Sequence, residues 1–324
     1  MINVAIVGYG NLGKGVLTAL KKTNDMNLVG IFTRRAPQTI AEQTGEKAYS
    51  VDSLLEFKGK IDVLILCGGS ATDLPTYTKI YLKDFNTVDS FDTHAKIPEY
   101  YEQLSSVAKA NNTLGAISIG WDPGVFSIAR ALFGAVLPDG ADYTFWGRGV
   151  SQGHSDALRR IDGVANAIQY TVPKEQALEL VRSGVKPDLS TREKHLRECY
   201  VAVKEGADKQ AIENEIVNMP NYFKDYDTVV NFVSEQEVKK MQEKLNHGGF
   251  VMRSGNTSSQ NSDLLELKLT LDSNPEFTGS VLVAYARAVY RLSKLGQTGV
   301  VTVFDVPLSM LSEKTNEELR KTLL

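Results

Sequence analysis

A glycine-rich segment near the N-terminus has the residue types and spacing to hold a phosphate. It directly follows an apolar run at residues 2–7. A first glycine would permit a tight turn, a second would let the backbone approach a pyrophosphate, and a third would let the next helix pack on the strand. The amides and dipole at the start of that helix would favour the phosphates. The candidate cofactor residues in this segment are Gly8, Tyr9, Gly10, Asn11, Leu12 and Gly13.

Two arginines decide which dinucleotide the segment would take. Residues 33–35 read Thr33-Arg34-Arg35 and follow the second apolar run. Enzymes that use NAD usually carry an acidic residue here, which would repel the extra phosphate of NADP. Guanidinium groups can hold that phosphate through bidentate, charge-assisted hydrogen bonds. The sequence therefore predicts NADP as the cofactor, although a solvated basic turn is the alternative. A later loop is expected to contact the same cofactor through Gly68, Gly69, Ser70, Ala71 and Thr72.

Short apolar runs alternate with helical patterns through the first third of the chain. This alternation predicts an α/β fold with a Rossmann-type, doubly wound parallel sheet. The pattern changes near residue 121, so we expect an NADP-binding domain at residues 1–120, completed by about 275–324. Residues 121–274 would form an α+β substrate and dimerisation domain. Expected strands are 2–7, 28–32, 61–67, 87–91, 114–119 and 300–306, and expected helices are 12–20, 75–82, 98–110, 125–136, 175–182, 208–219 and 277–295.

The second domain shows a half-buried strand pattern. Leucines alternate with polar residues from Leu265 to Leu271, which is typical of a sheet with one polar face. Residues 197–203 and 228–233 are its expected partner strands. Near the C-terminus, Thr315 and Glu318 have the spacing of a helix capping box.

Bulk composition excludes several classes of protein. The 324 residues are 42% hydrophobic and carry a net charge of -3, which argues against a nucleic-acid binder. No apolar run is long enough to span a membrane, and the N-terminus does not resemble a signal peptide. The two cysteines, Cys67 and Cys199, suit a reducing, cytoplasmic setting. The four histidines have no partner at metal-ligand spacing, so no catalytic metal is expected.

Several segments in chain order resemble meso-diaminopimelate dehydrogenases. They read VAIVGYGNLG, GIFTRRA, LCGGSATDLP, GWDPGVFSI, TFWGRGVSQGHSDALRRI, NHGG and LDSNPEFT, and they extend from residue 4 to residue 278. The stretch at residues 144–161 is the most specific, because no general dinucleotide-binding motif requires it. The resemblance implies reversible, NADP-dependent oxidative deamination of the D-centre of meso-2,6-diaminopimelate, in lysine and cell-wall precursor synthesis. It also implies a homodimer.

The same resemblance implies the substrate residues. Asp92, Trp121 and Asp122 would surround the D-centre. The middle and the distal L-centre would be held by Trp146, Ser151, Gln152, Gly153, Thr171, Arg197, His247 and Asn274. The motifs that assign roles to Thr171 and Arg197 match the family less closely than the glycine-rich segment does. Asn274 is the least firmly matched of the distal residues, because a variable loop separates it from His247.

The chemistry of these residues suits a substrate with two ammonium and two carboxylate groups. Asp92 and Asp122 can pair with the reacting ammonium, and Arg197 can clamp the remote carboxylate. Either aspartate can assist deprotonation, and the sequence does not choose between them. Taken alone, the alternation around Arg197 favours a solvent-facing strand residue, and a turn former is the alternative for Asp122. Another NADP-linked reductase with the same two-domain plan and a redox-sensing protein without catalysis are the rival interpretations.

Overall fold

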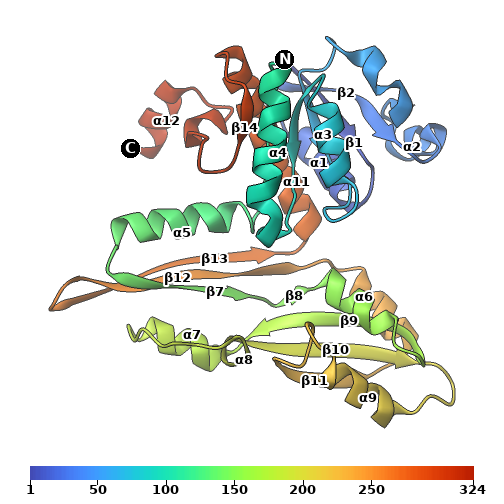
Figure 1. Cartoon of the computed structure of the whole chain (residues 1–324), viewed down its shortest axis with the longest axis vertical. Coiled ribbons are helices and arrows are strands. Elements are labelled where there is room, and N and C mark those ends of the chain that lie inside the picture. The colour runs from blue at the N-terminus through green and yellow to red at the C-terminus, as the bar shows by residue number, and fades with distance from the viewer. The chain divides into compact units, whose positions relative to one another are not determined.

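The computed structural model describes all 324 residues and separates them into two compact units. The first unit joins Met1–Ile128 to Pro275–Leu324, and the second is the continuous stretch Ala129–Asn274. Figure 1 colours the chain along its length and labels its elements. The chain therefore leaves the first unit once and returns to it once.

The first unit contains a fully parallel seven-stranded sheet in the order β14-β6-β5-β4-β1-β2-β3. The strand order reverses between β1 and β4, which is the place where doubly wound sheets bind ligands. The predicted α/β class and Rossmann-type sheet are confirmed. The strands are β1 (Ile2–Val7), β2 (Met26–Thr33), β3 (Ala48–Ser50), β4 (Val63–Leu66), β5 (Asn86–Asp89), β6 (Leu114–Ala116) and β14 (Gly299–Val301).

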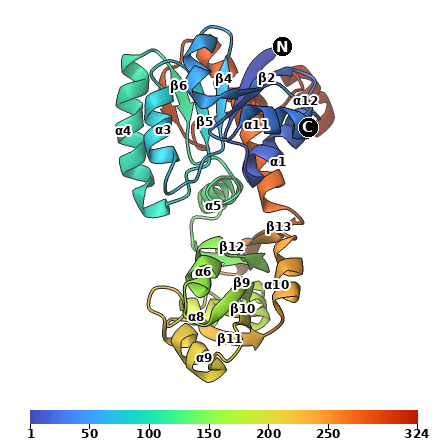
Figure 2. The ribbon, with the colours of Figure 1, turned by 90° about the vertical axis from the view of Figure 1, so that its right-hand side faces the viewer.

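Helices cover both faces of this sheet. Alternate residues of β1 and β4 face opposite layers, because successive side chains of a strand point to opposite sides. Val4 and Ile65 pack in the layer of α1 and α11, whereas Ala5 and Leu64 pack in the layer of α3 and α4. Helices α3 and α4 lie side by side in both views (Figures 1 and 2). The unit's helical segments are α1 (Asn11–Leu20), α2 (Pro37–Thr44), η1 (Val51–Phe57), α3 (Leu74–Tyr81), η2 (His94–Lys96), α4 (Ile97–Ala110), α11 (Asn274–Lys294), η3 (Leu308–Met310) and α12 (Asn316–Leu323).

Helices α1 and α11 touch through two glycines. A Cβ on Gly15 would lie 2.3 Å from the carbonyl oxygen of Pro275, and one on Gly279 would lie 2.6 Å from the backbone nitrogen of Val16. Only residues without a side chain allow the two backbones to approach so closely. This contact ties the returning C-terminal segment to the helix that begins at the glycine-rich segment.

The second unit contains two sheets. The four-stranded sheet has the order β11-β10-β9-β8, and the three-stranded sheet has the order β13-β12-β7. Figure 2 shows β9, β10 and β11 with α9 beside them. The strands are β7 (Gly140–Trp146), β8 (Gly149–Val150), β9 (Val164–Pro173), β10 (His195–Val203), β11 (Asp227–Phe232), β12 (His247–Ser258) and β13 (Asn261–Leu271). The helices are α5 (Val125–Val136), which begins in the first unit, α6 (Gln152–Arg159), α7 (Glu175–Arg182), α8 (Thr191–Lys194), α9 (Lys209–Asn218) and α10 (Glu235–Gln242).

The predicted partners of Leu265–Leu271 are wrong. Residues 197–203 and 228–233 pair with one another in the four-stranded sheet, whereas β13 pairs with β12. Only Ser259 and Gln260 separate β12 from β13, so the two strands form a hairpin. The alternation itself is confirmed, because Leu265 and Leu267 are half-buried while Glu266 between them is exposed.

The predicted strand at residues 300–306 is too long. Strand β14 ends at Val301, because the next residue enters a side-chain turn. The carboxylate of Asp305 accepts hydrogen bonds from the backbone nitrogen of Thr302 at 2.8 Å and from its hydroxyl at 2.9 Å. The long helix before β14 and the capping box at Thr315 and Glu318 are confirmed. None of the helices combines the length and the apolar character that crossing a bilayer requires.

Candidate active site

The glycine-rich segment connects β1 to α1 at the reversal of strand order. Gly8 has a φ of 95°, a conformation that favours glycine. A Cβ on Gly13 would lie 2.3 Å from the carbonyl oxygen of Gly8, so the helix packs closely on the turn. Nothing lies within 4 Å of a Cβ on Gly10, which leaves room for a ligand to approach the backbone. Asn11 and Leu12 open α1, and Tyr9 is buried. The segment thus has the form that a pyrophosphate requires.

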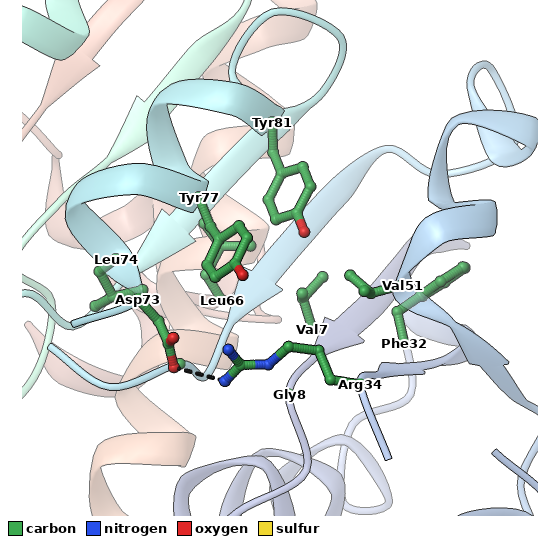
Figure 3. Close-up of a pocket in the computed structure, with 11 residues that line it drawn as sticks. Val7, Gly8, Phe32, Arg34, Val51, Leu66, Asp73, Leu74, Tyr77 and Tyr81 are labelled. Carbon is green, nitrogen blue, oxygen red and sulfur yellow. Dashed lines mark hydrogen bonds and ion pairs between the residues drawn. The ribbon is translucent and has the colours of Figure 1, made fainter. Parts of the chain in front are cut away.

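Arg34 extends across a pocket at the ends of β2 and β4 (Figure 3). One guanidinium nitrogen lies 3.0 Å from a carboxylate oxygen of Asp73, and the guanidinium carbon lies 5.6 Å from the ring centroid of Tyr77. The pocket beneath is apolar and is lined by Val7, Gly8, Phe32, Arg34, Val51, Leu66, Gly68, Asp73, Leu74, Tyr77 and Tyr81. Sequence reasoning gave no role to Asp73, although it lies in the segment LCGGSATDLP, or to Tyr77, which lies outside the quoted segments.

Arg35 turns toward the glycine-rich segment. Its guanidinium donates to the carbonyl oxygen of Tyr9, and its backbone nitrogen donates to the hydroxyl of Thr33 at 3.1 Å. Thr33 is buried at the end of β2. The side chains of Arg34 and Arg35 therefore extend in different directions from the end of β2. Arg34 lines the pocket, and Arg35 contacts the glycine-rich segment.

The loop after β4 joins the cofactor region to the first acidic candidate. Gly68–Thr72 follows β4, and the backbone nitrogen of Gly69 donates to Asp73 at 2.9 Å. The backbone nitrogen of Asp92 lies 2.9 Å from the hydroxyl oxygen of Ser70. Asp92 is exposed. Ser70, a predicted cofactor residue, thus contacts the backbone of Asp92, a predicted catalytic residue. Ala71 and Thr72 lie in the turn that leads into α3.

A buried carboxylate that the sequence reasoning missed organises the neighbouring loops. Asp89 is fully buried at the end of β5. One oxygen accepts from the backbone nitrogens of Phe91 at 3.0 Å and Ser118 at 3.2 Å. The other accepts from the hydroxyls of Thr78 at 3.1 Å and Tyr100 at 2.7 Å. Burial raises the pKa of the Asp89 carboxyl, and these hydrogen bonds oppose that rise. Asp89 thereby links the loop before Asp92 to the segment before Trp121.

Trp121 and Asp122 precede α5. The Trp121 indole is buried and meets Phe126 edge-on, with ring centroids 5.2 Å apart. Asp122 is half-buried and is joined to Pro123 by a cis peptide bond. A Cβ on Gly124 would lie 1.7 Å from the carbonyl oxygen of Gly120, so this turn is tightly closed. Asp92, Trp121 and Asp122 all belong to the first unit.

The other predicted substrate residues belong to the second unit. Thr171 and Arg197 are directly paired across β9 and β10, and the Arg197 guanidinium donates to the Thr171 hydroxyl. Arg197 is only 7% exposed, and no carboxylate forms an ion pair with it. Burial lowers the pKa of Arg197 and is the main cause that lowers the pKa of His154 to about 4 and of His195 to about 3. The positive charge of Arg197 also contributes to lowering the pKa values of both imidazoles.

His247 joins this group through a glycine. A Cβ on Gly149 would lie 2.3 Å from the His247 ring, and Gly149 pairs with Thr171 in the sheet. The structure therefore brings Thr171, Arg197 and His247 to one end of the second unit. Asn274 is half-buried and its backbone nitrogen donates to the carbonyl oxygen of Leu245 at 2.8 Å.

Trp146 and the loop before α6 complete the predicted set. Trp146 is 38% exposed, stacks on His195 with centroids 5.4 Å apart, and its backbone nitrogen donates to the His195 ring at 2.9 Å. The Ser151 hydroxyl lies 2.7 Å from His154 Nδ1. Gln152 and Gly153 are exposed at the start of α6. Sequence reasoning assigned no role to His154 or His195, because neither has a metal-ligand partner in the sequence.

A Rossmann-type sheet with a glycine-rich turn, together with a second unit that buries a guanidinium without an ion pair, fits a two-domain dehydrogenase. Comparisons with a family profile, with related sequences and with solved structures identify the family within this class. The sequence profile of the diaminopimelic acid dehydrogenase C-terminal domain matches residues 120–273. The meso-diaminopimelate D-dehydrogenase of Ureibacillus thermosphaericus is 55% identical over 100% of this chain and 99% of the relative. The chain belongs to the meso-diaminopimelate D-dehydrogenase family of oxidoreductases.

Solved structures agree. A meso-diaminopimelate dehydrogenase mutant from Clostridium tetani, solved with DAP, has a TM-score of 0.95, is 51% identical and is matched over 100% of both chains. An engineered D-amino acid dehydrogenase bound to NADP+ has a TM-score of 0.86 and 40% identity, over 100% of this chain and 99% of that one. The predicted family is therefore confirmed.

Proposed function

We propose that this protein oxidatively deaminates the D-centre of meso-2,6-diaminopimelate, with NADP as cofactor. The products are L-2-amino-6-oxopimelate and ammonia, and the reaction is reversible. The observation that carries the substrate assignment is Arg197, a buried guanidinium without an anionic partner in the protein. A buried charge without a partner is costly, so such a group is suited to a carboxylate that arrives with the substrate. Thr171 would share that carboxylate.

The C. tetani mutant supports the set of distal residues. Its six substitutions replace a glutamine, a threonine, an arginine, a proline, a histidine and an asparagine. Without the proline, successive positions are 19, 26, 50 and 27 residues apart. In this chain the same residue types occur in the same order with the same spacings, as Gln152, Thr171, Arg197, His247 and Asn274. We therefore propose that these five side chains bind the substrate.

The residues of the first unit fit a dinucleotide. Room above Gly10 and the turn at Gly8 suit the pyrophosphate, and Arg34 at the mouth of an apolar pocket suits a phosphorylated ribose beside adenine. Arg35 would contribute a second positive charge. When bound, the oxidised nicotinamide would supply the hydride acceptor. The structure of a relative with NADP+ supports this choice of cofactor.

The side chains of this chain would perform the remaining steps. The D-centre ammonium must lose a proton before its carbon can release a hydride, and Asp92 or Asp122 would accept that proton. Trp121, which is buried and precedes Asp122 in the sequence, would limit the access of water to the reacting carbon. Transfer of hydride to the oxidised nicotinamide would give a substrate iminium ion, water would add to its carbon, and ammonia and a proton would leave to give the carbonyl. Distal contacts at Arg197 would hold the carbon in position during these steps.

We also propose a homodimer formed through the second unit. Leu132 and Val136 are 55% and 59% exposed on α5, four residues apart, and Leu264 on β13 is 37% exposed. Exposed apolar side chains at helical spacing are typical of an interface. Light scattering of the wild type and of Leu132→Glu tests this: a dimer that the substitution weakens is expected, and a wild-type monomer would contradict it. A cytoplasmic location and a role in lysine synthesis belong to the same proposal.

The deciding experiment is NADPH formation, followed by absorbance, with meso-diaminopimelate. The LL isomer and NAD are measured in parallel. We expect activity with the meso isomer and NADP, and little with either alternative. Binding of NADPH without turnover of meso-diaminopimelate would contradict the substrate assignment and leave the cofactor assignment standing.

A further inference from the structure

Arg197 lies on an aromatic ring that no predicted motif contains. Its guanidinium carbon is 3.8 Å from the ring centroid of Tyr226. This is the shortest of the arginine-to-ring distances in the chain; those of Arg34, Arg148 and Arg182 are 5.0 Å or more. A cation placed over an aromatic face is attracted to it, and more strongly when both groups are removed from water. Tyr226 therefore has a direct effect on the orientation of Arg197.

The position of Tyr226 is itself fixed. Its backbone nitrogen donates to the carbonyl oxygen of Phe223 at 2.9 Å. The next residue, Asp227, begins β11 and pairs with Lys174 at 2.5 Å and with Arg192 at 2.8 Å. Ion pairs on both sides of Asp227 hold the end of the segment that carries the ring. These contacts restrain the backbone from which the Tyr226 ring extends.

Few other contacts restrain Arg197. The Arg197 guanidinium donates to the Thr171 hydroxyl, a side-chain hydrogen bond with Tyr226 opposes the lowering of its pKa by burial, and its Nε atom is buried without an acceptor. Its paired residue on β11 is Thr228, so both neighbours in the sheet row are uncharged. The contact with Thr171 alone does not fix the plane of the guanidinium. The Tyr226 ring restrains that plane by holding one of its faces.

We infer that Tyr226 is a positioning residue for substrate selection, because its ring fixes the plane in which Arg197 meets the remote carboxylate of the substrate. The inference rests on the proposed role of Arg197. A fixed plane lets the guanidinium form its paired, in-plane hydrogen bonds to a carboxylate without losing further freedom on binding. Tyr226 would thus favour substrates that carry a carboxylate at the end opposite the reacting carbon.

Three variants test the inference. Tyr226→Leu removes the ring, and Tyr226→Phe keeps the ring and serves as the matched control. We expect Tyr226→Leu to raise KM for meso-diaminopimelate by about 10- to 30-fold, the equivalent of up to about 2 kcal/mol, with kcat nearly unchanged. Tyr226→Phe, which removes only the hydroxyl, should keep most of the affinity if the ring holds Arg197, and a loss as large as that of Tyr226→Leu would overturn the role of the ring. Tyr226→Met replaces the leucine variant if thermal melting shows that the latter is not folded.

A double-mutant cycle with Arg197→Met separates this role from a general effect on structure. If the ring acts through the guanidinium, Tyr226→Leu should cause little further loss in kcat/KM once Arg197 has been replaced. Equal fold losses in both backgrounds would overturn the inference, as would a fall in kcat with KM unchanged. Calorimetric titration with meso-diaminopimelate measures the same loss as Kd without turnover. It therefore tests the ring even if the wild type forms no NADPH.

Discussion

Replacing Arg34 by alanine should separate the two dinucleotides. The 2′-phosphate of NADP would gain charge-assisted hydrogen bonds from Arg34, each worth about 1.5–3 kcal/mol. Against this stands the ion pair of Arg34 with Asp73, which the phosphate would have to share or replace. That pair costs little to disturb, because the Arg34 side chain is 63% exposed, and exposed pairs are worth about 0–1 kcal/mol. For one such hydrogen bond the net loss on Arg34→Ala is therefore about 0.5–3 kcal/mol, or roughly 2- to 150-fold in Kd.

NAD lacks the phosphate, so its affinity should change little. Calorimetric titration of wild type and Arg34→Ala with NADP+ and NAD+ gives both constants directly. Raising the salt concentration should shrink the difference for NADP+, because exposed charges are screened. Lys22→Ala, which removes an exposed cation just beyond the C-terminal end of α1, is the matched control for loss of charge. An equal loss for NADP+ and NAD+ would refute the phosphate role of Arg34.

Three further outcomes are expected. Whichever of Asp92→Asn and Asp122→Asn removes the base should lower kcat more than it weakens substrate binding in steady-state assays, and full activity in both variants would exclude either as the base. Gly279→Ala should lower the free energy of unfolding in urea by about 1–3 kcal/mol, because its Cβ would overlap the backbone of α1, and an unchanged midpoint would contradict that contact. Hydrogen bonds from Arg287 lower the pKa of Asp25, so the stability gained from Asp25 is present above its unfolded pKa of about 3.9 and is lost as pH falls through the lower folded value. Urea titrations of wild type and Asp25→Asn from pH 5 to 2.5 should therefore converge at the acid end, and a constant difference would oppose this explanation.

Local rules predicted the first unit well. Strands β1 and β4 are apolar on both faces, and the glycine-rich segment follows β1 directly, so sequence alone indicated a parallel sheet and its ligand-binding edge. The second unit was harder, because its strands pair over long and variable separations. Strand β12 begins with His247-Gly248-Gly249 and has no clear alternation, so the true partner of β13 was not recognised. Only the fold reveals that a two-residue turn joins them.

The residues of the candidate site also divide into those that sequence motifs identified and those that they did not. Motifs identified Arg34 and Arg197, whose types suit anions. They did not identify Asp89 or Tyr226, whose importance comes from what they touch. A buried aspartate with four hydrogen-bond donors and a ring under a guanidinium depend on residues far apart in the sequence. Such supporting residues have no spacing of their own, so single-sequence reasoning has no pattern by which to find them.

The discontinuous first unit has a consequence for how the chain folds during synthesis. A ribosome releases residues 1–128 before α11 and β14 exist, although Leu282 and Val283 of α11 belong to the same core as Val4 and Ile65. The part of that layer which α11 covers therefore has no helix over it until the whole second unit has emerged. The second unit is continuous and has all its strands at that point. The second unit can therefore fold first. Helix α11 is synthesised directly after it and then packs on the parallel sheet of the first unit.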